Sequence, residues 1–158
     1  ILWQSGDVYP AQEHFVTNLI RQKLISATDV LTHSFNPKAR RFLLLLPEGE
    51  WHEIGLLFAQ YLLKEASQEV FYLGQSVPYS DVLATGSAKQ FDYIMVSSTS
   101  KQSGFDFEVY LKDLGGAFPD KRILYFCSYL HERPEGLGEN HIQLNSIEDL
   151  VALIDDLS

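Results

Sequence analysis

Residues 42–55, FLLLLPEGEWHEIG, decide the fold of this chain. The uninterrupted apolar run Phe42–Leu46 is typical of a strand buried on both faces of a parallel sheet. Pro47 ends the run, and a polar loop containing His52 follows before a helical pattern begins near Ile54. The stretch therefore predicts a strand, a loop and a helix, which together form the first unit of an α/β fold.

The same alternation continues to the end of the chain. Further strands are expected at Glu69–Leu73, Tyr93–Ser97, Arg122–Phe126 and His141–Leu144, and helices over 54–62, Pro78–Ser87, Phe105–Leu114 and from Ser146 onwards. The pair Gly115-Gly116 predicts the end of the third of these helices. Strands that alternate with helices predict a five-stranded, flavodoxin-like (Rossmann-like) parallel sheet of order 2-1-3-4-5, with helices on both faces.

Ligands of such sheets bind at the carboxyl ends of the strands. We therefore expect the loops 47–55, 97–104 and 127–139 to lie together on one rim.

Residues 1–36 have a different pattern. Pro10 suits a helix start, and the apolar residues that follow at helical spacing are Phe15, Val16, Leu19, Ile20 and Leu24. Ser26 or Asp29 is expected to cap a short second helix. Pro37 marks a hinge, so we predict a helical segment over 1–36 and an α/β domain over 40–158. Such a helix needs partners, from an upstream segment or a second subunit.

Composition narrows the possible functions. A net charge of −9 and a pI near 4.9 disfavour contact with phosphate backbones, so DNA binding is expected only through an upstream domain. Cys127 is the single cysteine, which excludes an internal disulfide. No apolar run reaches the roughly 20 residues of a membrane helix, and no signal peptide is apparent. A cytoplasmic fragment of a longer protein is expected.

The pattern Glu50-x-His52-x-x-Gly55 is the strongest candidate site. An imidazole can give one nitrogen to a metal while the other donates to a carboxylate such as Glu50. Gly55 leaves room for a ligand to approach the backbone. The alternative is a solvated helix start, in which Glu50 and Glu53 interact with the helix dipole.

This pattern resembles the Asp-x-His-x-x-Gly signature of cobalamin-binding domains, and glutamate at its first position is similar to the CarH/LitR-like regulators of the MerR family. The segment YLGQSVP (72–78) also resembles their second strand and the turn after it. The resemblance covers roughly residues 41–130. It implies a C-terminal cobalamin-binding domain for adenosylcobalamin or methylcobalamin, with His52 as the lower cobalt ligand and Glu50 hydrogen-bonded to it.

The N-terminal segment carries a second match. A tryptophan followed after nine residues by a Glu-His pair is found here as Trp3, Glu13 and His14. The pattern resembles the helical cap of the same regulators, which covers the upper face of the corrin. The resemblance implies that Trp3 shields the cobalt and that Glu13 and His14 bind the upper ligand. The alternative is a helix-packing tryptophan beside a solvated Glu/His pair.

Three motifs depart from the family pattern. The family's Ser-x-Leu is Ser97-Ser98-Thr99 here, and its Gly-Gly is Cys127-Ser128. Ser97, Thr99, Cys127 and Ser128 are therefore expected beside the nucleotide tail, in a channel that the last two narrow. Gln4 stands where the photoreceptors have a histidine, which weakens the expectation of a light response.

The leading hypothesis is a cobalamin sensor that is not an enzyme, that self-associates, and that reaches DNA through an upstream MerR-type domain. The alternatives are a corrinoid-binding module of a methyltransferase or mutase, and a degenerate regulator domain that has lost cobalamin. A receiver domain is set aside because Ser97 stands where its aspartate is needed. His131 is expected to be a solvent-exposed loop residue.

Overall fold

The computed structural model describes residues 9–31 and 36–157. It contains one parallel sheet of order β2-β1-β3-β4-β5. The strands are β1 (Arg41–Pro47), β2 (Glu69–Val77), β3 (Tyr93–Ser98), β4 (Arg122–Cys127) and β5 (His141–Gln143); the helices are α1 (Pro10–Asp29), α2 (Ile54–Glu65), α3 (Tyr79–Ala88), α4 (Phe107–Ala117) and α5 (Ile147–Asp156). The predicted flavodoxin-like fold class is confirmed.

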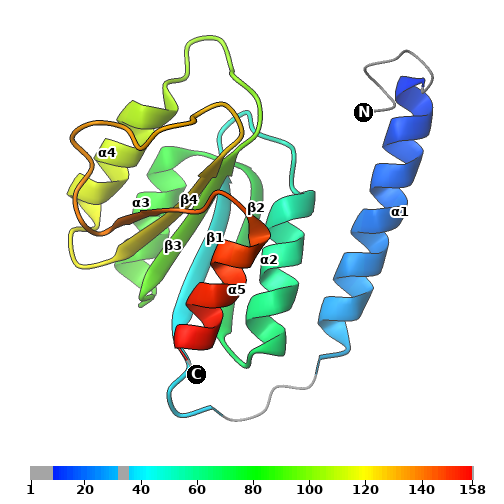
Figure 1. Cartoon of the computed structure of the whole chain (residues 1–158), viewed down its shortest axis with the longest axis horizontal. Coiled ribbons are helices and arrows are strands. Elements are labelled where there is room, and N and C mark those ends of the chain that lie inside the picture. The colour runs from blue at the N-terminus through cyan, green and yellow to red at the C-terminus, as the bar shows by residue number, and fades with distance from the viewer. Residues whose placement is uncertain (1–8, 32–35, 158) are drawn as a thin grey trace.

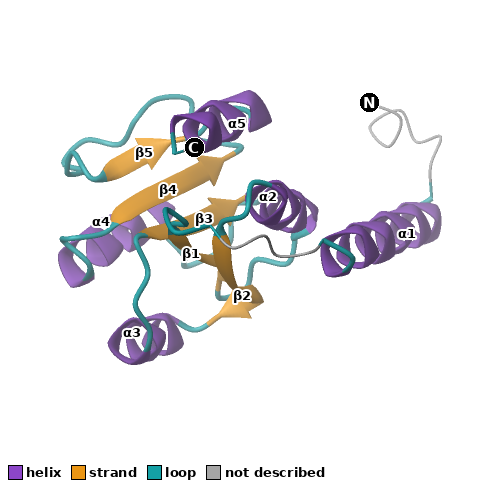
Figure 2. Ribbon diagram, turned by 90° about the horizontal axis from the view of Figure 1, so that it is seen from below, coloured by secondary structure: helices purple, strands orange, loops and turns teal. Residues whose placement is uncertain are grey.

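The sheet separates two apolar cores (Figures 1 and 2). Helices α3 and α4 cover one face, where Leu43 and Leu45 of β1 point. Helices α2 and α5 cover the other, where Leu44 and Leu46 point. Successive side chains of a strand alternate between faces, so the apolar run of β1 supplies both cores and is wholly buried.

Helix α1 lies outside this three-layer sandwich and packs against α2 (Figure 2). It is one continuous helix from Pro10 to Asp29, so the prediction of a short second helix capped by Ser26 or Asp29 is wrong. Thr28 donates from Oγ1 to the carbonyl of Leu24 at 2.7 Å, which satisfies a polar side chain inside the last turn. No helix in the described part of the chain combines the length and apolarity needed to cross a membrane.

Helix α4 also differs from its expected length. It runs through Gly115-Gly116 to Ala117, so the prediction that this pair ends the helix is wrong. The imidazole of His141 packs against Gly115, where a Cβ atom would lie 2.4 Å from Cε1 of His141. The ring of His141 also contacts the carbonyl of Leu111 at 2.9 Å through Nε2. Gly115 therefore provides space for a buried side chain and does not cap the helix.

Candidate functional site

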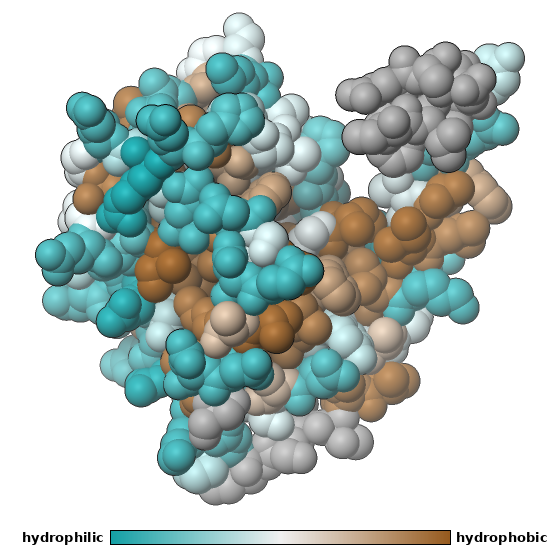
Figure 3. Space-filling view, viewed as in Figure 1, coloured by the Kyte–Doolittle hydropathy of each residue, from teal (hydrophilic) through white to brown (hydrophobic). Residues whose placement is uncertain are grey.

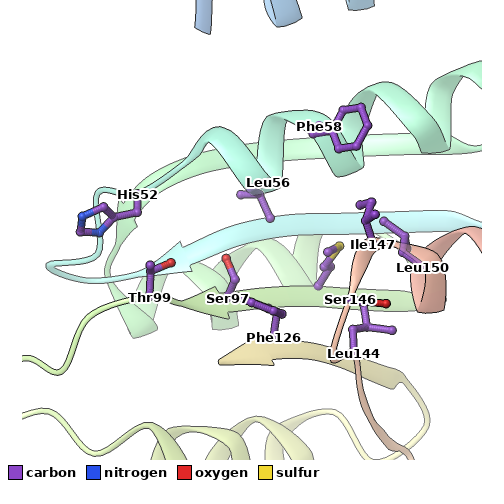
Figure 4. Close-up of a pocket in the computed structure, with 12 residues that line it drawn as sticks. His52, Leu56, Phe58, Ser97, Thr99, Phe126, Leu144, Ser146, Ile147 and Leu150 are labelled. Atoms are coloured by element: carbon purple, nitrogen blue, oxygen red, sulfur yellow. The ribbon is translucent and has the colours of Figure 1, made fainter. Parts of the chain in front are cut away.

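His52 lies in the loop after β1, at the rim where the parallel strands end (Figure 4). Its side chain is 61% exposed, and its Nδ1 lies 2.6 Å from Oε1 of Glu50. The expected contact between these two residues is confirmed. Nδ1 can donate to this carboxylate, and in the tautomer that does so Nε2 keeps its lone pair for a metal. Among the described residues Nε2 has no hydrogen-bond partner.

Glu50 is fully buried and holds two loops together. Its carboxylate accepts from the backbone N–H groups of Trp51, His52, Thr99 and Ser100, at 2.9, 3.0, 2.7 and 3.2 Å. Burial by itself raises the pKa of Glu50, but these hydrogen bonds and the contact with the His52 ring outweigh it and lower the pKa from 4.5 to about 2. The carboxylate therefore stays ionised and fixes the orientation of the imidazole.

A cavity of about 260 Å³, here called the apolar groove, begins at His52 and runs between the sheet and helices α2 and α5 (Figure 4). Its lining is His52, Gly55, Leu56, Phe58, Met95, Ser97, Thr99, Phe126, Leu144, Ser146, Ile147 and Leu150. Most of these side chains are apolar. The hydroxyl-bearing residues are Ser97 and Thr99 near the rim and Ser146 at the far end.

A second cavity of about 680 Å³, here called the cap cleft, lies between α1 and the rim. Glu13 and His14 line it from α1, and His52, Gly55 and Thr99 line it from the α/β domain. His52 thus stands between the two cavities, with the apolar groove on one side and the cap cleft on the other.

An ion pair connects α1 to the residue that follows His52. The guanidinium of Arg21 binds the carboxylate of Glu53, whose side chain is almost fully buried. The hydroxyl of Tyr72, on β2, donates to the same carboxylate at 3.1 Å. Burial, and next the charge of Glu53, raise the pKa of Tyr72, which keeps its hydroxyl protonated. Glu53 therefore links α1, the His52 loop and the sheet.

The predicted site residues differ in which of the two cavities they line. Gly55 and Thr99 border both cavities, while Ser97 lines the apolar groove alone. A Cβ atom on Gly55 would meet nothing within 4 Å, so the expected open space is present. The groove lining does not include Cys127 or Ser128.

Cys127 and Ser128 lie on β4 and in the loop after it. Cys127 packs into the core on the opposite face of the sheet, and Phe126 faces the groove in its place. Ser128 donates from Oγ to the carbonyl of Thr99 at 2.5 Å. These two residues do not line the apolar groove, and their expected effect on a nucleotide channel stays a prediction. Trp3 and Gln4 lie outside the described residues.

Sequence reasoning missed most of the groove lining and the Arg21–Glu53 pair. The alternation of Met95, Ser97 and Thr99 along the third strand was the available signal, since residues two apart share a face. The apolar members, such as Phe126 and Leu150, have no sequence feature that separates them from ordinary core residues.

Comparison with known proteins supports the motif-based resemblance. The chain is 36% identical over 119 residues to the HTH-type transcriptional repressor CarH of Myxococcus xanthus, covering 74% of the chain and 38% of CarH. It is 31% identical over 103 residues to the repressor CarA of the same organism, covering 65% of the chain and 35% of CarA. The chain thus spans little more than a third of these curated relatives. No family model matches it.

The fold has solved counterparts. The Methanosarcina barkeri monomethylamine corrinoid protein superimposes with a TM-score of 0.76 at 12% identity, over 99% of this chain and 76% of that one. At this identity the match concerns the fold alone. The chain therefore belongs to the family of the CarH-like transcriptional repressors, as its motifs predicted, and its α/β fold is similar to that of the Methanosarcina barkeri protein.

Proposed function

We propose that this chain is the cobalamin-sensing domain of a transcription regulator and that His52 is the lower cobalt ligand. The observation that carries the proposal is the arrangement of His52 itself. Its Nδ1 is held by the buried, ionised carboxylate of Glu50, while the exposed ring presents Nε2 at the junction of two cavities.

The residues present suit a corrinoid. One imidazole supplies one coordination bond, so the remaining ligands of a metal at His52 must come from the cofactor itself. When bound, cobalamin would supply a cobalt ion with an exchangeable upper ligand. The apolar groove beside His52 offers a place for the displaced lower base, and Gly55 leaves the wall open where the two cavities meet.

The cap cleft suits the upper side of the same cofactor. Glu13 and His14 supply hydrogen-bonding side chains from α1, and the resemblance to the CarH-like cap assigns Trp3 to shield the cobalt. An adenosyl group carries ribose hydroxyls and adenine nitrogens that such side chains can bind. Adenosylcobalamin is therefore the proposed form. Illumination of the loaded protein tests whether loss of the adenosyl group changes the structure of the domain.

Helix α1 connects the ligand site to the rest of the regulator. It carries large exposed apolar side chains at Phe15, Val16, Leu19, Ile20 and Ile25, and Figure 3 shows apolar side chains gathered along α1. Such a surface supports association with an upstream segment or a second subunit. Cobalamin would bias the position of α1, and that bias would pass to self-association and to an upstream MerR-type DNA-binding domain.

The test is spectroscopic. Purified protein is mixed with adenosylcobalamin in the dark, desalted, and its visible spectrum recorded. We expect retained cofactor with histidine in place of the benzimidazole base as lower ligand. His52→Ala should abolish this spectrum, and His131→Ala, a change at an exposed loop histidine, should leave it intact.

The same measurement addresses the methyltransferase alternative. Protein that takes up methylcobalamin in the His52-bound form, transfers the methyl group to an added thiol and rejects adenosylcobalamin would favour a corrinoid-carrier role. Protein that retains neither form would contradict the proposal and favour a domain that has lost its cofactor.

A further inference from the structure

The apolar groove is lined by few polar side chains. Apart from His52 at the mouth, the described residues that line it include no charged side chain and no side-chain amide. Deep in the groove, Met95, Phe126, Leu144 and Leu150 contribute only apolar surface. A ligand group that enters this part of the groove leaves water and is surrounded by apolar side chains.

The polar groups that remain are hydroxyls. The hydroxyl of Ser97 is directed into the groove from β3 (Figure 4) and makes no hydrogen bond with another described residue. Ser146 lies at the start of α5, where its backbone N–H donates to Asp149 at 3.2 Å. A hydroxyl donates one hydrogen bond and can accept others, and the described lining residues carry only three hydroxyls, so the groove offers an incoming ring few partners.

The size of the groove also limits its occupant. At about 260 Å³ it is smaller than the roughly 300–1,000 Å³ of sites that enclose drug-sized ligands. A bicyclic aromatic base matches that volume better than a whole nucleotide. The base would therefore enter the groove while the sugar and phosphate of the tail stay near the exposed rim.

We infer that the apolar groove selects corrinoids by their lower base, accepting a benzimidazole-type base and rejecting a purine-type base. The inference rests on the proposed function and concerns the same site. A benzimidazole in the displaced state has one free ring nitrogen, which Ser97 can satisfy. A purine adds further ring nitrogens and an exocyclic amino group. Its polar groups outnumber the hydroxyls of Ser97, Thr99 and Ser146, so some of them would be buried without a partner.

The experiment titrates the whole chain in the dark with three corrinoids that share one upper ligand. These are cobalamin, a cobamide whose lower base is adenine, and cobinamide, which has no nucleotide. The dissociation constant is read from the absorption change caused by His52 coordination. Cobalamin should bind at least about tenfold more tightly than the adenine cobamide, a difference of about 1.4 kcal/mol, and also more tightly than cobinamide.

Two variants assign the selectivity to the groove. Ile147→Asn places a side-chain amide in the wall of the groove, at a partly buried position, where it can hydrogen-bond a purine. It should reduce the preference for cobalamin over the adenine cobamide to within about threefold. Val151→Asn, at an exposed position on the same helix outside the lining, should leave the preference unchanged. Ser97→Ala should weaken cobalamin binding and leave cobinamide binding unaffected. Thermal unfolding of each variant checks its folding.

The outcomes separate two failures. If the adenine cobamide binds as tightly as cobalamin, or if cobinamide equals cobalamin, the groove does not select a base and the inference is overturned while the sensor proposal stands. If none of the three corrinoids produces a His52-dependent spectrum, the proposed function itself fails.

Discussion

Oε1 of Glu50 lies 2.6 Å from Nδ1 of His52, although the carboxylate is completely buried and the imidazole is mostly exposed. The buried partner is anchored by four backbone N–H groups on two loops, so its position is set by the fold. The exposed partner is thereby held in one orientation with its other nitrogen facing outward. A histidine on a mobile loop would lose its conformational freedom on binding, and this loss would weaken the affinity.

The first prediction concerns stability and pH. Because the pKa of Glu50 falls from 4.5 in the unfolded chain to about 2 in the folded one, its ionisation stabilises the fold by about 3 kcal/mol at neutral pH. A depressed carboxyl pKa contributes fully above about pH 5. The contribution is lost as the pH falls from 4.5 towards 2.

Glu50→Gln should remove this contribution, since the new amide NH₂ faces backbone donors. The free energy of unfolding, measured by urea titration, should drop by about 2–4 kcal/mol at pH 7, and the gap to the unaltered protein should shrink below about pH 4. Glu48→Gln alters an exposed carboxylate two residues away and serves as the control. Equal gaps at pH 7 and pH 3 would refute the assignment.

The second prediction concerns the link between α1 and the His52 loop. Arg21→Met leaves the buried carboxylate of Glu53 with the Tyr72 hydroxyl but without its cation. Because Arg21 is partly exposed, the loss should be about 1–2 kcal/mol, between the values for surface and buried pairs. Hydrogen exchange should accelerate in α1 more than in the sheet.

Lys23→Met is the control for that change, because Lys23 is exposed on the same helix. It should alter the free energy of unfolding by no more than about 0.5 kcal/mol. If both variants behave alike, the ion pair does not fix α1 on the domain.

The α/β fold followed from the sequence because its signals are local. An uninterrupted apolar run, turn residues and helical spacing each act over a few positions. The alternation of elements then predicts a parallel sheet, and five strands favour the flavodoxin-like order. The Glu50–His52 contact could be predicted for the same reason, since the two residues lie close together in one loop. The Arg21–Glu53 pair joins positions 32 residues apart, and no local pattern marks it.

The wrong predictions also have tertiary causes. A pair of glycines ordinarily suggests a helix end, but α4 continues through it because His141 packs where a side chain on Gly115 would stand. The effect of Cys127-Ser128, which stand in place of two glycines, stays a prediction, but the sequence did not indicate that the cysteine packs on the sheet face opposite the groove. Side-chain direction depends on the register of β4, which sequence patterns define poorly.

The third prediction compares those two adjacent glycines. Gly115→Ala would bring a Cβ within 2.4 Å of the His141 ring, and overpacking should cost about 1–3 kcal/mol. Gly116→Ala meets nothing within 4 Å and should stabilise α4 by up to about 1 kcal/mol through helix propensity. Opposite shifts in melting temperature are expected, and shifts of the same sign would contradict the packing role given to His141.

The fourth prediction sets stability against binding at Gly55. This residue lies in the first turn of α2, borders both cavities, and leaves open space where a Cβ would be. Gly55→Ala should therefore raise the free energy of unfolding by about 0.5–1 kcal/mol through helix propensity. Under the proposed function the same methyl group occupies the place where the corrinoid crosses from one cavity to the other, so its affinity should fall at least about tenfold.

Gly116→Ala again supplies the comparison, because it adds the same methyl group to a helix in the described part of the domain outside both cavity linings. It should raise stability and leave the dissociation constant of cobalamin unchanged. A Gly55→Ala protein that is more stable and binds cobalamin as tightly as the unaltered chain would mean that the corrinoid does not pass over this turn. The free space beside His52 would then serve some other ligand, because the fold itself gains nothing from leaving it empty.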